Sequence, residues 1–137
     1  MKTRIALLST LIAAPLLLTA TPARSACTGE SGYVYVWDSC VTETYHRASS
    51  PCHRENDERT KSVYIISNVI WDGPERTRDW PSERFANSYA RSTGGASVSG
   101  NDSYCFQSRA EAEDKRESDI AYRMRHGSTL YRVHISE

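Results

Sequence analysis

The stretch SVYIISNVIW, residues 62–71, decides how this chain folds. It is the most strand-like piece of the sequence, because β-branched and aromatic residues fill it and no proline interrupts it. The segment that follows, DGPERTRD, ends the strand with Gly73 and Pro74, which break regular structure. The core of the fold should therefore begin at Ser62 with a buried strand.

A first helix is predicted to follow near Pro81. Proline is favoured in the first turn of a helix, because its missing N–H would have no partner there. Phe85 and Tyr89 lie four residues apart and so share one face. Gly94 then stands where glycine usually caps the C-terminal end. The sequence therefore predicts a helix from about Pro81 to Gly94.

A second helix is predicted from Ser108 to about Arg125. Ser108 and Glu111 form a capping box, in which each side chain satisfies a free amide at the helix start. Gly127 is the expected stop. The predicted inner face of this helix collects Ala110, Glu113, Glu117, Ile120, Ala121 and Met124.

Two carboxylates stand on that inner face where apolar residues are expected. Glu113 and Glu117 lie four residues apart and should repel each other. If the two were buried together, one would have a raised pKa and could act as an acid. The plainer interpretation is that this end overhangs the sheet, with Arg109 or Arg116 offsetting the charge.

The remaining strands complete the fold class. SYCF, residues 103–106, and STLYRVHI, residues 128–135, are predicted strands. The core, residues 62–137, then has the order β-α-β-α-β. Strands separated by helices favour crossover connections that place helices on a sheet face. We therefore expect an α+β fold, a small ferredoxin-like β-α-β-α-β sandwich.

Residues 26–61 are expected to form an N-terminal disulfide-rich hairpin ahead of this core. YVYVW, residues 33–37, is rich in aromatic and β-branched residues. VTETYH, residues 41–46, alternates and is expected to pair with it. The polar tract RASSPCHRENDERTK then predicts a loop.

The first 25 residues have the layout of a secretory signal peptide. A basic start precedes an apolar run, and small residues precede the expected cleavage after Ser25. The apolar run is shorter than the roughly 20 residues that span a bilayer, which disfavours a retained transmembrane helix. A lipid anchor on Cys27 is disfavoured because Arg24 stands where such sites prefer leucine. We expect a periplasmic or secreted protein with no membrane span after signal removal.

Removal of the signal peptide leaves an acidic chain. The whole sequence has 17 basic and 17 acidic residues, and Lys2, Arg4 and Arg24 precede the cleavage site. The remaining 112 residues therefore carry 14 basic and 17 acidic residues, a net charge of −3. This balance argues against a nucleic-acid binder, which depends on phosphate contacts. It also argues against a polybasic membrane clamp.

Four cysteines predict two disulfides in an exported domain of this size. They are Cys27, Cys40, Cys52 and Cys105. Three pairings are possible. We prefer a bond from Cys105 to one of the other three, because closing a long loop restricts the unfolded chain most. A zinc site is the rival, but no Cys-x-x-Cys pair occurs and the four histidines form no metal pattern. No cofactor is expected.

Tryptophans and arginines between the first strand and the first helix predict a binding surface. The residues are Trp71, Arg76, Arg78 and Trp80. Amphipathic rings and arginine are both favoured at interfaces. The alternative is that the rings plug the ends of the core.

Two resemblances can be drawn from the second half of the chain. SYCFQSRAEAEDKRESDI followed by STLYRVHI resembles one half of a SPOR domain, a periplasmic fold that binds peptidoglycan. The second half that would complete such a domain is not found. The longer pattern from VYIISNVIW through FANSYA to AEAEDKR is similar to small exported bacterial proteins without an assigned function. The first resemblance implies a cell-wall ligand, and neither supplies catalytic residues.

These observations lead to competing hypotheses of function. The first is an exported, non-enzymatic binding module for an envelope protein or for peptidoglycan, with an inhibitor or immunity protein as one version. The alternative is a small exported hydrolase that uses Glu113 or Glu117 with a histidine such as His134. A structural envelope component without a discrete ligand is the third.

Overall fold

The computed structural model describes Cys27 and residues 30–137. The signal peptide expected at the start of the chain lies outside the described residues. The elements, in order, are β1 (Gly32–Val34), β2 (Val36–Val41), β3 (Ser62–Ser67), β4 (Ile70–Asp72), α1 (Trp80–Ser92), β5 (Asn101–Asp102), α2 (Arg109–Arg125) and β6 (Ser128–Val133).

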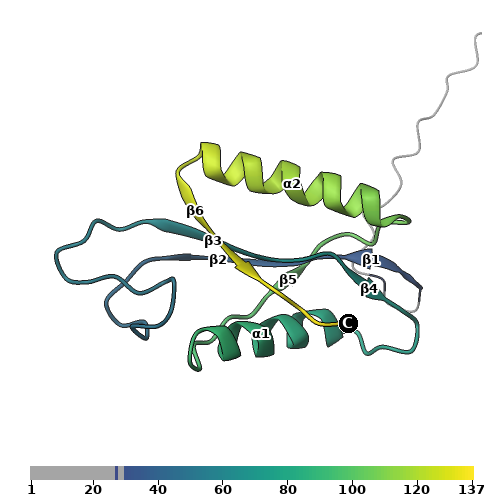
Figure 1. Ribbon diagram of the computed structural model, residues 1–137, viewed down its shortest axis with the longest axis horizontal. Helices are drawn as coiled ribbons and strands as arrows, with labels where there is room; N and C mark the ends of the chain where they lie inside the picture. The colour runs from purple at the N-terminus through teal and green to yellow at the C-terminus, as the bar shows by residue number, and fades with distance from the viewer. Residues whose placement is uncertain (1–26, 28–29) are drawn as a thin grey trace, which may run out of the picture.

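A mixed four-stranded sheet forms the middle layer. Its strand order is β5-β2-β3-β6, with β2 antiparallel to β3 and β6 parallel to β3. β1 and β4 form a separate antiparallel pair, each next in the chain to a strand of the main sheet. The two helices lie on opposite faces of the sheet (Figure 1). The molecule therefore has three layers, helix on sheet on helix.

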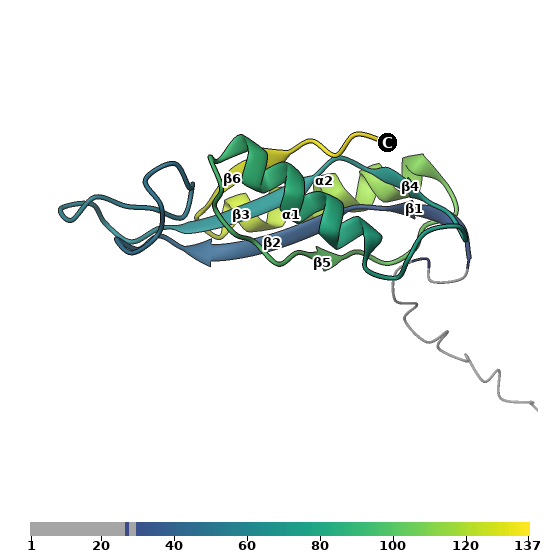
Figure 2. The same cartoon turned by 90° about the horizontal axis from the view of Figure 1, so that it is seen from below.

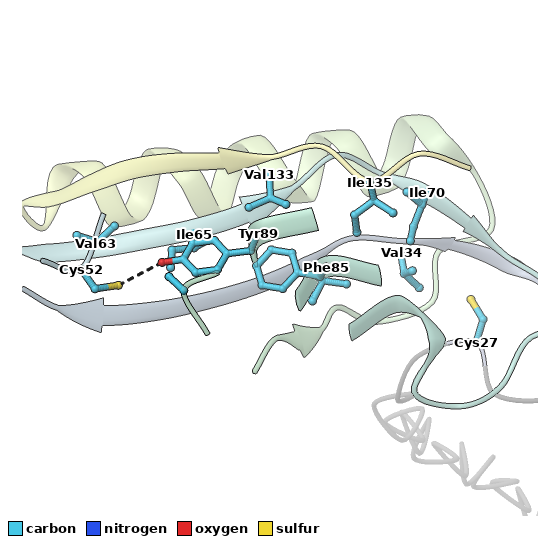
Figure 3. Packing of buried hydrophobic residues seen from close by; sticks show 12 residues of the cluster. Cys27, Val34, Cys52, Val63, Ile65, Ile70, Phe85, Tyr89, Val133 and Ile135 are labelled. Carbon is cyan, nitrogen blue, oxygen red and sulfur yellow. Dashed lines mark hydrogen bonds between the residues drawn. The ribbon is translucent and has the colours of Figure 1, made fainter. Parts of the chain in front are cut away.

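The central strand β3 explains these layers. Val63 and Ile65 point to one face, where they join the core cluster of Phe85 and Tyr89 from α1 (Figure 3). Tyr64 and Ile66 point to the other face and join the cluster that contains Ile120 of α2. Successive side chains of a strand alternate between faces, so a strand covered on both faces is apolar throughout.

The fold class is confirmed as a small α+β domain, but the strand predicted at residues 62–71 is split into β3 and β4, so the order from residue 62 onward is β-β-α-β-α-β. The arrangement differs from the ferredoxin-like sandwich that we expect, because the helices do not share a face of the sheet. A single helical layer would leave either Val63 and Ile65 or Tyr64 and Ile66 in water. Burial of both sets requires a helix on each side.

The partner of the first long strand differs from the prediction. β2 pairs with β3, so the predicted hairpin forms with residues 62–67 as its second strand rather than with residues 41–46. YVYVW still alternates as expected, with its valines on the α1 side and its aromatic rings on the α2 side. The buried strand β3 offers a longer apolar partner than the polar segment that follows Val41, and burial decides the pairing.

The predicted strand at residues 103–106 is also displaced, because β5 ends at Asp102. The segment still runs along the edge of the sheet. Ser103 N–H donates to the carbonyl of Tyr35 at 2.8 Å, and Phe106 N–H donates to that of Tyr33 at 2.9 Å. The backbone advances three residues from Ser103 to Phe106 but only two from Tyr35 to Tyr33. The one extra residue interrupts the regular pattern of hydrogen bonds between the strands.

Between β1 and β2, and again between β3 and β4, side chains supply the hydrogen-bond partners that a neighbouring strand would otherwise give to the backbone. Val36 N–H, at the start of β2, donates to Ser67 Oγ at 2.8 Å. The Asn68 side chain accepts from Ile135 N–H at 2.7 Å and donates to the carbonyl of the same residue at 3.1 Å. Arg116 Nε, reaching in from α2, donates to the Ser67 carbonyl. Buried backbone groups need such partners, so these residues hold the break together.

The inner face of α2 differs from the prediction. Its buried residues are Ala112, Arg116 and Ile120, spaced four apart. Of the six residues assigned to that face, only Ile120 is buried, and Met124 is 54% exposed. The cause is Arg116, a charged residue on the inner face. Its aliphatic stem packs as an apolar residue would, which a hydrophobic pattern cannot register.

Both predicted disulfides are present and they use all four cysteines. Cys27 pairs with Cys105, as preferred, with a Cα–Cα distance of 5.0 Å. Cys40 pairs with Cys52 at 5.9 Å. The first bond ties the start of the described chain to the segment before α2. The second closes a short loop within residues 40–52.

The two disulfides should differ in their contribution to stability. They close loops with sequence separations of 78 and 12 residues. In the loop-entropy account, replacing Cys27 and Cys105 by alanine should lower the free energy of unfolding by about 4 kcal/mol. Replacing Cys40 and Cys52 should lower it by about 3 kcal/mol. Urea unfolding of both double variants measures which disulfide contributes more to the free energy of unfolding.

A larger loss for the Cys40–Cys52 variant would contradict this account. Thiol titration of the unmodified protein without reductant is the matching control, and it should detect no free thiol.

Candidate binding surfaces

The predicted residues Arg76 and Trp80 lie against each other. The guanidinium carbon of Arg76 is 3.4 Å from the centroid of the Trp80 ring, and that of Arg84 is 5.5 Å away. Trp80 is half-buried at the start of α1. Such stacking is a cation–π contact. Part of the Trp80 ring is therefore already covered by arginine.

Trp71 is tied to the C-terminal residue. Its ring meets the Tyr33 ring edge-on at a centroid distance of 5.0 Å. The backbone N–H of Trp71 donates to Glu137 Oε1 at 3.0 Å, and Arg109 Nη2 donates to the same oxygen at 2.9 Å. The Trp71 N–H, followed by the Arg109 side chain, lowers the pKa of Glu137. This carboxylate links the end of the chain to β4 and α2.

The structure thus brings two of the four predicted binding residues into direct contact. The charge of Arg76 also helps to lower the pKa of Glu137, whereas Trp71 contacts this carboxylate directly. Arg78 is exposed on the loop between β4 and α1. We name Trp71, Arg76, Arg78 and Trp80 the tryptophan–arginine end. The rings of Trp71 and Trp80 contact other side chains of the same chain, as expected if they fill the ends of the core. The role of this surface in binding stays a prediction.

A long arm projects at the opposite end of the molecule. Residues 42–61 connect β2 to β3 and reach past both helices (Figures 1 and 2). We name this segment the arm. At its base, Thr42 N–H donates to the Lys61 carbonyl, and Lys61 N–H donates to Thr42 Oγ1, both at 2.8 Å. The arm therefore continues the direction of the sheet.

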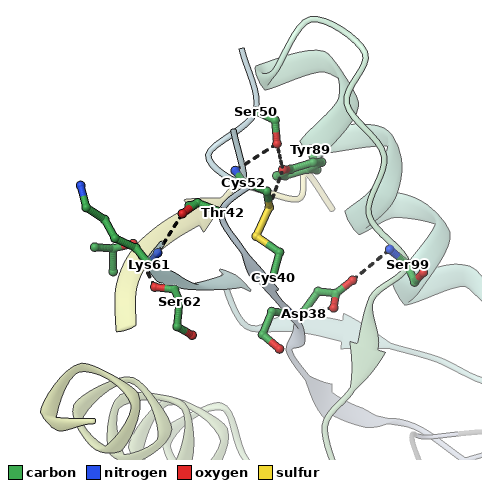
Figure 4. Close-up of a disulfide and its surroundings, with 11 residues drawn as sticks. Asp38, Cys40, Thr42, Ser50, Cys52, Lys61, Ser62, Tyr89 and Ser99 are labelled. Carbon is green, nitrogen blue, oxygen red and sulfur yellow. Dashed lines mark hydrogen bonds between the residues drawn. A yellow bond between two sulfur atoms is a disulfide. The ribbon is translucent and has the colours of Figure 1, made fainter. Parts of the chain in front are cut away.

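The first half of the arm is fastened to α1. Cys52 is bonded to Cys40 of β2, and Ser50 Oγ lies 3.0 Å from the Tyr89 hydroxyl (Figure 4). Arg47 Nη1 donates to the carbonyl of Gly94 at 2.6 Å. The disulfide therefore fixes this half to β2, and the two hydrogen-bonded contacts fix it to α1 and to the turn that follows α1.

The second half forms an exposed tip with its own hydrogen bonds. Glu58 N–H donates to the Glu55 carbonyl at 3.1 Å, and Glu55 N–H donates back to Glu58 Oε2 at 3.2 Å. Arg54 Nη1 donates to the Glu58 carbonyl at 3.0 Å. Residues 55–61 are all exposed. The tip is thus ordered by local contacts while its surface faces solvent.

An aromatic cleft beside α2 was missed by the sequence analysis. Its cavity of about 230 Å³ is lined by Trp37 of β2, Tyr64 of β3, and Asp119, Tyr122 and Arg123 of α2. A signal existed, since Trp37 and Tyr64 stand in predicted strands and Tyr122 in a predicted helix. It could not be used, because the pairing of β2 with β3 and the rotation of α2 were both unknown.

The two glutamates singled out in α2 serve a buried arginine. Arg116 Nη1 lies 2.5 Å from Glu117 and 3.7 Å from Glu113. Both carboxylates are largely accessible to water, with side-chain exposures of 56% and 42%. The interpretation of a buried, mutually repelling pair is therefore wrong, and Arg116 offsets their charge. His134, the suggested partner, is exposed on the final segment.

One carboxyl group does lie in an unfavourable environment. Asp102 of β5 is paired with Val36, and cross-strand partners share a face, here the α1 side. Its Oδ1 atom is buried without a hydrogen-bond partner in the described part of the chain. Burial, followed by the charges of Asp72 and Asp79, raises the pKa of Asp102 to about 6. Within Cys27 and residues 30–137, no three His, Cys, Asp or Glu side chains gather to hold a metal ion.

Comparison with known proteins adds no relative. No family model, curated protein or solved structure matches the chain. Two disulfides are typical of an oxidising compartment outside the cytoplasm. None of the helices in the described residues is long and apolar enough to cross a membrane. The function therefore has to be inferred from the surfaces above.

Asp102→Asn should remove a pH dependence of stability. The folded-state pKa lies above the ordinary value of 3.8, so the protonated form favours folding. That contribution is complete below about pH 4 and is lost as the pH rises through about 6. The variant should therefore be more stable than the parent at pH 7, on the order of 1 kcal/mol, and similar to it at pH 4.

Urea unfolding at several pH values between these limits measures the difference between the two proteins. Asp114→Asn, an exposed change on α2, is the control and should leave the parent profile unchanged. A difference that does not vary with pH would contradict the assignment to Asp102.

Proposed function

We propose that the protein is an exported, disulfide-stabilised, non-enzymatic binding module that holds a protein of the cell envelope. In this proposal it acts as an inhibitor or immunity protein does, by occupying a cavity of its partner. The protein acts in the periplasm or outside the cell, in keeping with its two disulfides. The observation that carries the proposal is the ordered arm that projects from the body.

The arm has the properties of a preformed binding element. A loop that is already ordered loses less conformational freedom when it binds, which increases affinity. The Cys40–Cys52 disulfide and the contact between Ser50 and Tyr89 order the base of the arm. The hydrogen bonds between Glu55 and Glu58 order its tip. Order without burial is costly for a loop that only connects two strands, and it favours a role in recognition.

The charge of the tip indicates the surface that it would fit. Glu55, Asp57 and Glu58 place three carboxylates within four exposed residues. Arg59 and Lys61 bring the net charge of the exposed residues 55–61 to −1, so the acidic part of the arm is its apex at residues 55–58, which is complementary to a basic surface. The mature chain, with its net charge of −3, has the same sign. The partner would therefore present a basic cleft, as enzymes that act on anionic substrates do.

Binding to peptidoglycan is the second candidate, through the tryptophan–arginine end. The observation in its favour is that rings and guanidinium groups gather there around Glu137. The contact of Arg76 with Trp80 leaves less ring surface for stacking on a sugar, which favours the protein partner. The segment from α2 to β6 resembles one half of a SPOR domain, and this resemblance is the second reason to propose a cell-wall ligand.

The hydrolase alternative has no support in the geometry. Glu113 and Glu117 are the counterions of Arg116 and lie outside the cavities described above. We therefore do not assign them a catalytic role.

A photo-crosslinking residue at Asp57 should capture the partner in intact cells. The same residue at Arg78 reports on the tryptophan–arginine end, and at Arg125, exposed on α2, it serves as the control. We expect one discrete protein adduct from Asp57 that is absent from Arg125. Excess unlabelled protein should compete it away, whereas Asp57→Lys should compete at least about tenfold less well because it reverses the charge at the tip.

Asp114→Lys makes the same charge change on an exposed site of α2 and should compete like the parent. An adduct that Asp57→Lys competes away as efficiently as Asp114→Lys would contradict the role of the arm.

Co-sedimentation with purified sacculi tests the second candidate. If the tryptophan–arginine end binds peptidoglycan, binding should be saturable, and Trp80→Ala should weaken it about fivefold or more through the lost aromatic contact. Arg78→Gln is a milder change in the same surface, and Asp57→Lys is the control at the opposite end. No sedimentation above that of an inert protein of similar size would remove peptidoglycan as the ligand.

A further inference from the structure

The aromatic cleft beside α2 is built from three elements that lie far apart in the sequence. Trp37 and Tyr64 are half-buried and buried on neighbouring strands, with ring centroids 5.9 Å apart. Tyr122 of α2 is 53% exposed and forms the outer wall of the cavity. Three aromatic rings therefore surround a space of about 230 Å³ that opens to the surface.

A positive charge already lies against two of these rings. The guanidinium carbon of Arg123 is 5.4 Å from the Trp37 centroid and 5.0 Å from the Tyr64 centroid. Aromatic faces are negative and attract cations at this range. Arg123 is a half-buried residue of the last turn of α2 and lines the cavity. The protein's own side chain thus shows which kind of group these rings accept.

The carboxylate of Asp119 gives the cleft a negative charge, which would attract a cation. Asp119 lines the cavity, and its Oδ2 accepts a hydrogen bond from the Tyr35 hydroxyl at 2.6 Å. Lys115 contacts its other oxygen and lines a neighbouring cavity. An anionic ligand would meet this carboxylate and would be repelled. A cationic ligand would be attracted by both the carboxylate and the rings.

Tyr64 of the cleft and Tyr35, which lies beside it on Asp119, stay neutral over the physiological range. Burial, followed by the charge of Asp119, raises the pKa of Tyr64 to about 12. Burial and the hydrogen bond to Asp119 also raise the pKa of Tyr35 well above its usual value. The rings therefore present uncharged faces, and Asp119 alone supplies negative charge among the groups that line this cavity.

We infer that the aromatic cleft is a binding site for an alkylated ammonium group, with Arg123 as the lid that the ligand displaces. A methylated ammonium is weakly hydrated compared with a primary ammonium, so it loses little on leaving water for a ring-lined site. Cages of aromatic rings with a nearby carboxylate suit this chemistry. A second cavity of about 260 Å³ shares Trp37 and Asp119 with the first and leaves room for the rest of the ligand.

Titration of the protein with choline chloride, followed by NMR of the backbone amides, tests the site. We expect saturable shifts confined to the cleft. The neutral isostere 3,3-dimethylbutan-1-ol should bind at least about fivefold more weakly, because it lacks the charge. Arg123→Gln should tighten choline binding several-fold by removing the competing cation. Tyr122→Ala, an exposed change, should weaken it about fivefold.

Arg125→Gln is the matched control, since it removes an exposed arginine from the same turn of α2 without touching the cleft. Thermal unfolding of each variant checks that it is folded. The inference is overturned if the neutral isostere binds as tightly as choline. It is also overturned if Arg123→Gln and Tyr122→Ala both behave like Arg125→Gln, or if choline fails to saturate the parent and Arg123→Gln alike.

Vesicles separate the two sources of such a group. Binding to phosphatidylcholine vesicles but not to phosphatidylglycerol vesicles, weakened by Tyr122→Ala, would support a lipid headgroup as the ligand. Choline binding without vesicle binding would support a small solute. The outcome is independent of the arm, because residues 42–61 line neither of the two cavities.

Discussion

The burial of β3 on both faces is the constraint on which the rest of the structure depends. One short strand presents Val63 and Ile65 to α1 and Tyr64 and Ile66 to α2. Each pair is removed from water only if a helix covers its side, so the sheet must lie between two helical layers. The same strand also needs a neighbour on each edge, which β2 and β6 supply. The β2–β3 hairpin and the later segment from α1 to β6 together provide both.

The second helix shows how a charged residue can belong to a core. Arg116 is 6% exposed and donates to the Ser67 carbonyl at the break between β3 and β4. A buried guanidinium needs compensating charge, and Glu113 and Glu117 supply it from the same helix. Within the acidic stretch after the last cysteine, Glu113 and Glu117 therefore balance the charge of Arg116, whose side chain donates to a backbone carbonyl at the break in the sheet.

Three surfaces remain once the core is accounted for, and they differ in how far the sequence could identify them. The tryptophan–arginine end was predictable, because its four residues lie within ten positions of one another. The arm was predictable only as a polar loop, since its order comes from Tyr89 and Gly94, residues about forty positions away. The aromatic cleft was not predictable, because Trp37, Tyr64 and Tyr122 meet only after β2 pairs with β3 and α2 packs over them.

Local chemistry determined much of this protein from the sequence alone. The capping residue Ser108, the glycine at position 94 and the apolar run of β3 act over a few residues, so both helices and the central strand could be located. Four cysteines in a chain that is expected to be exported implied two disulfides. Only the tertiary structure decided which strands pair, which face of α2 turns inward and that Cys27 meets Cys105. Those choices depend on contacts between distant segments, whose free energies no local pattern records.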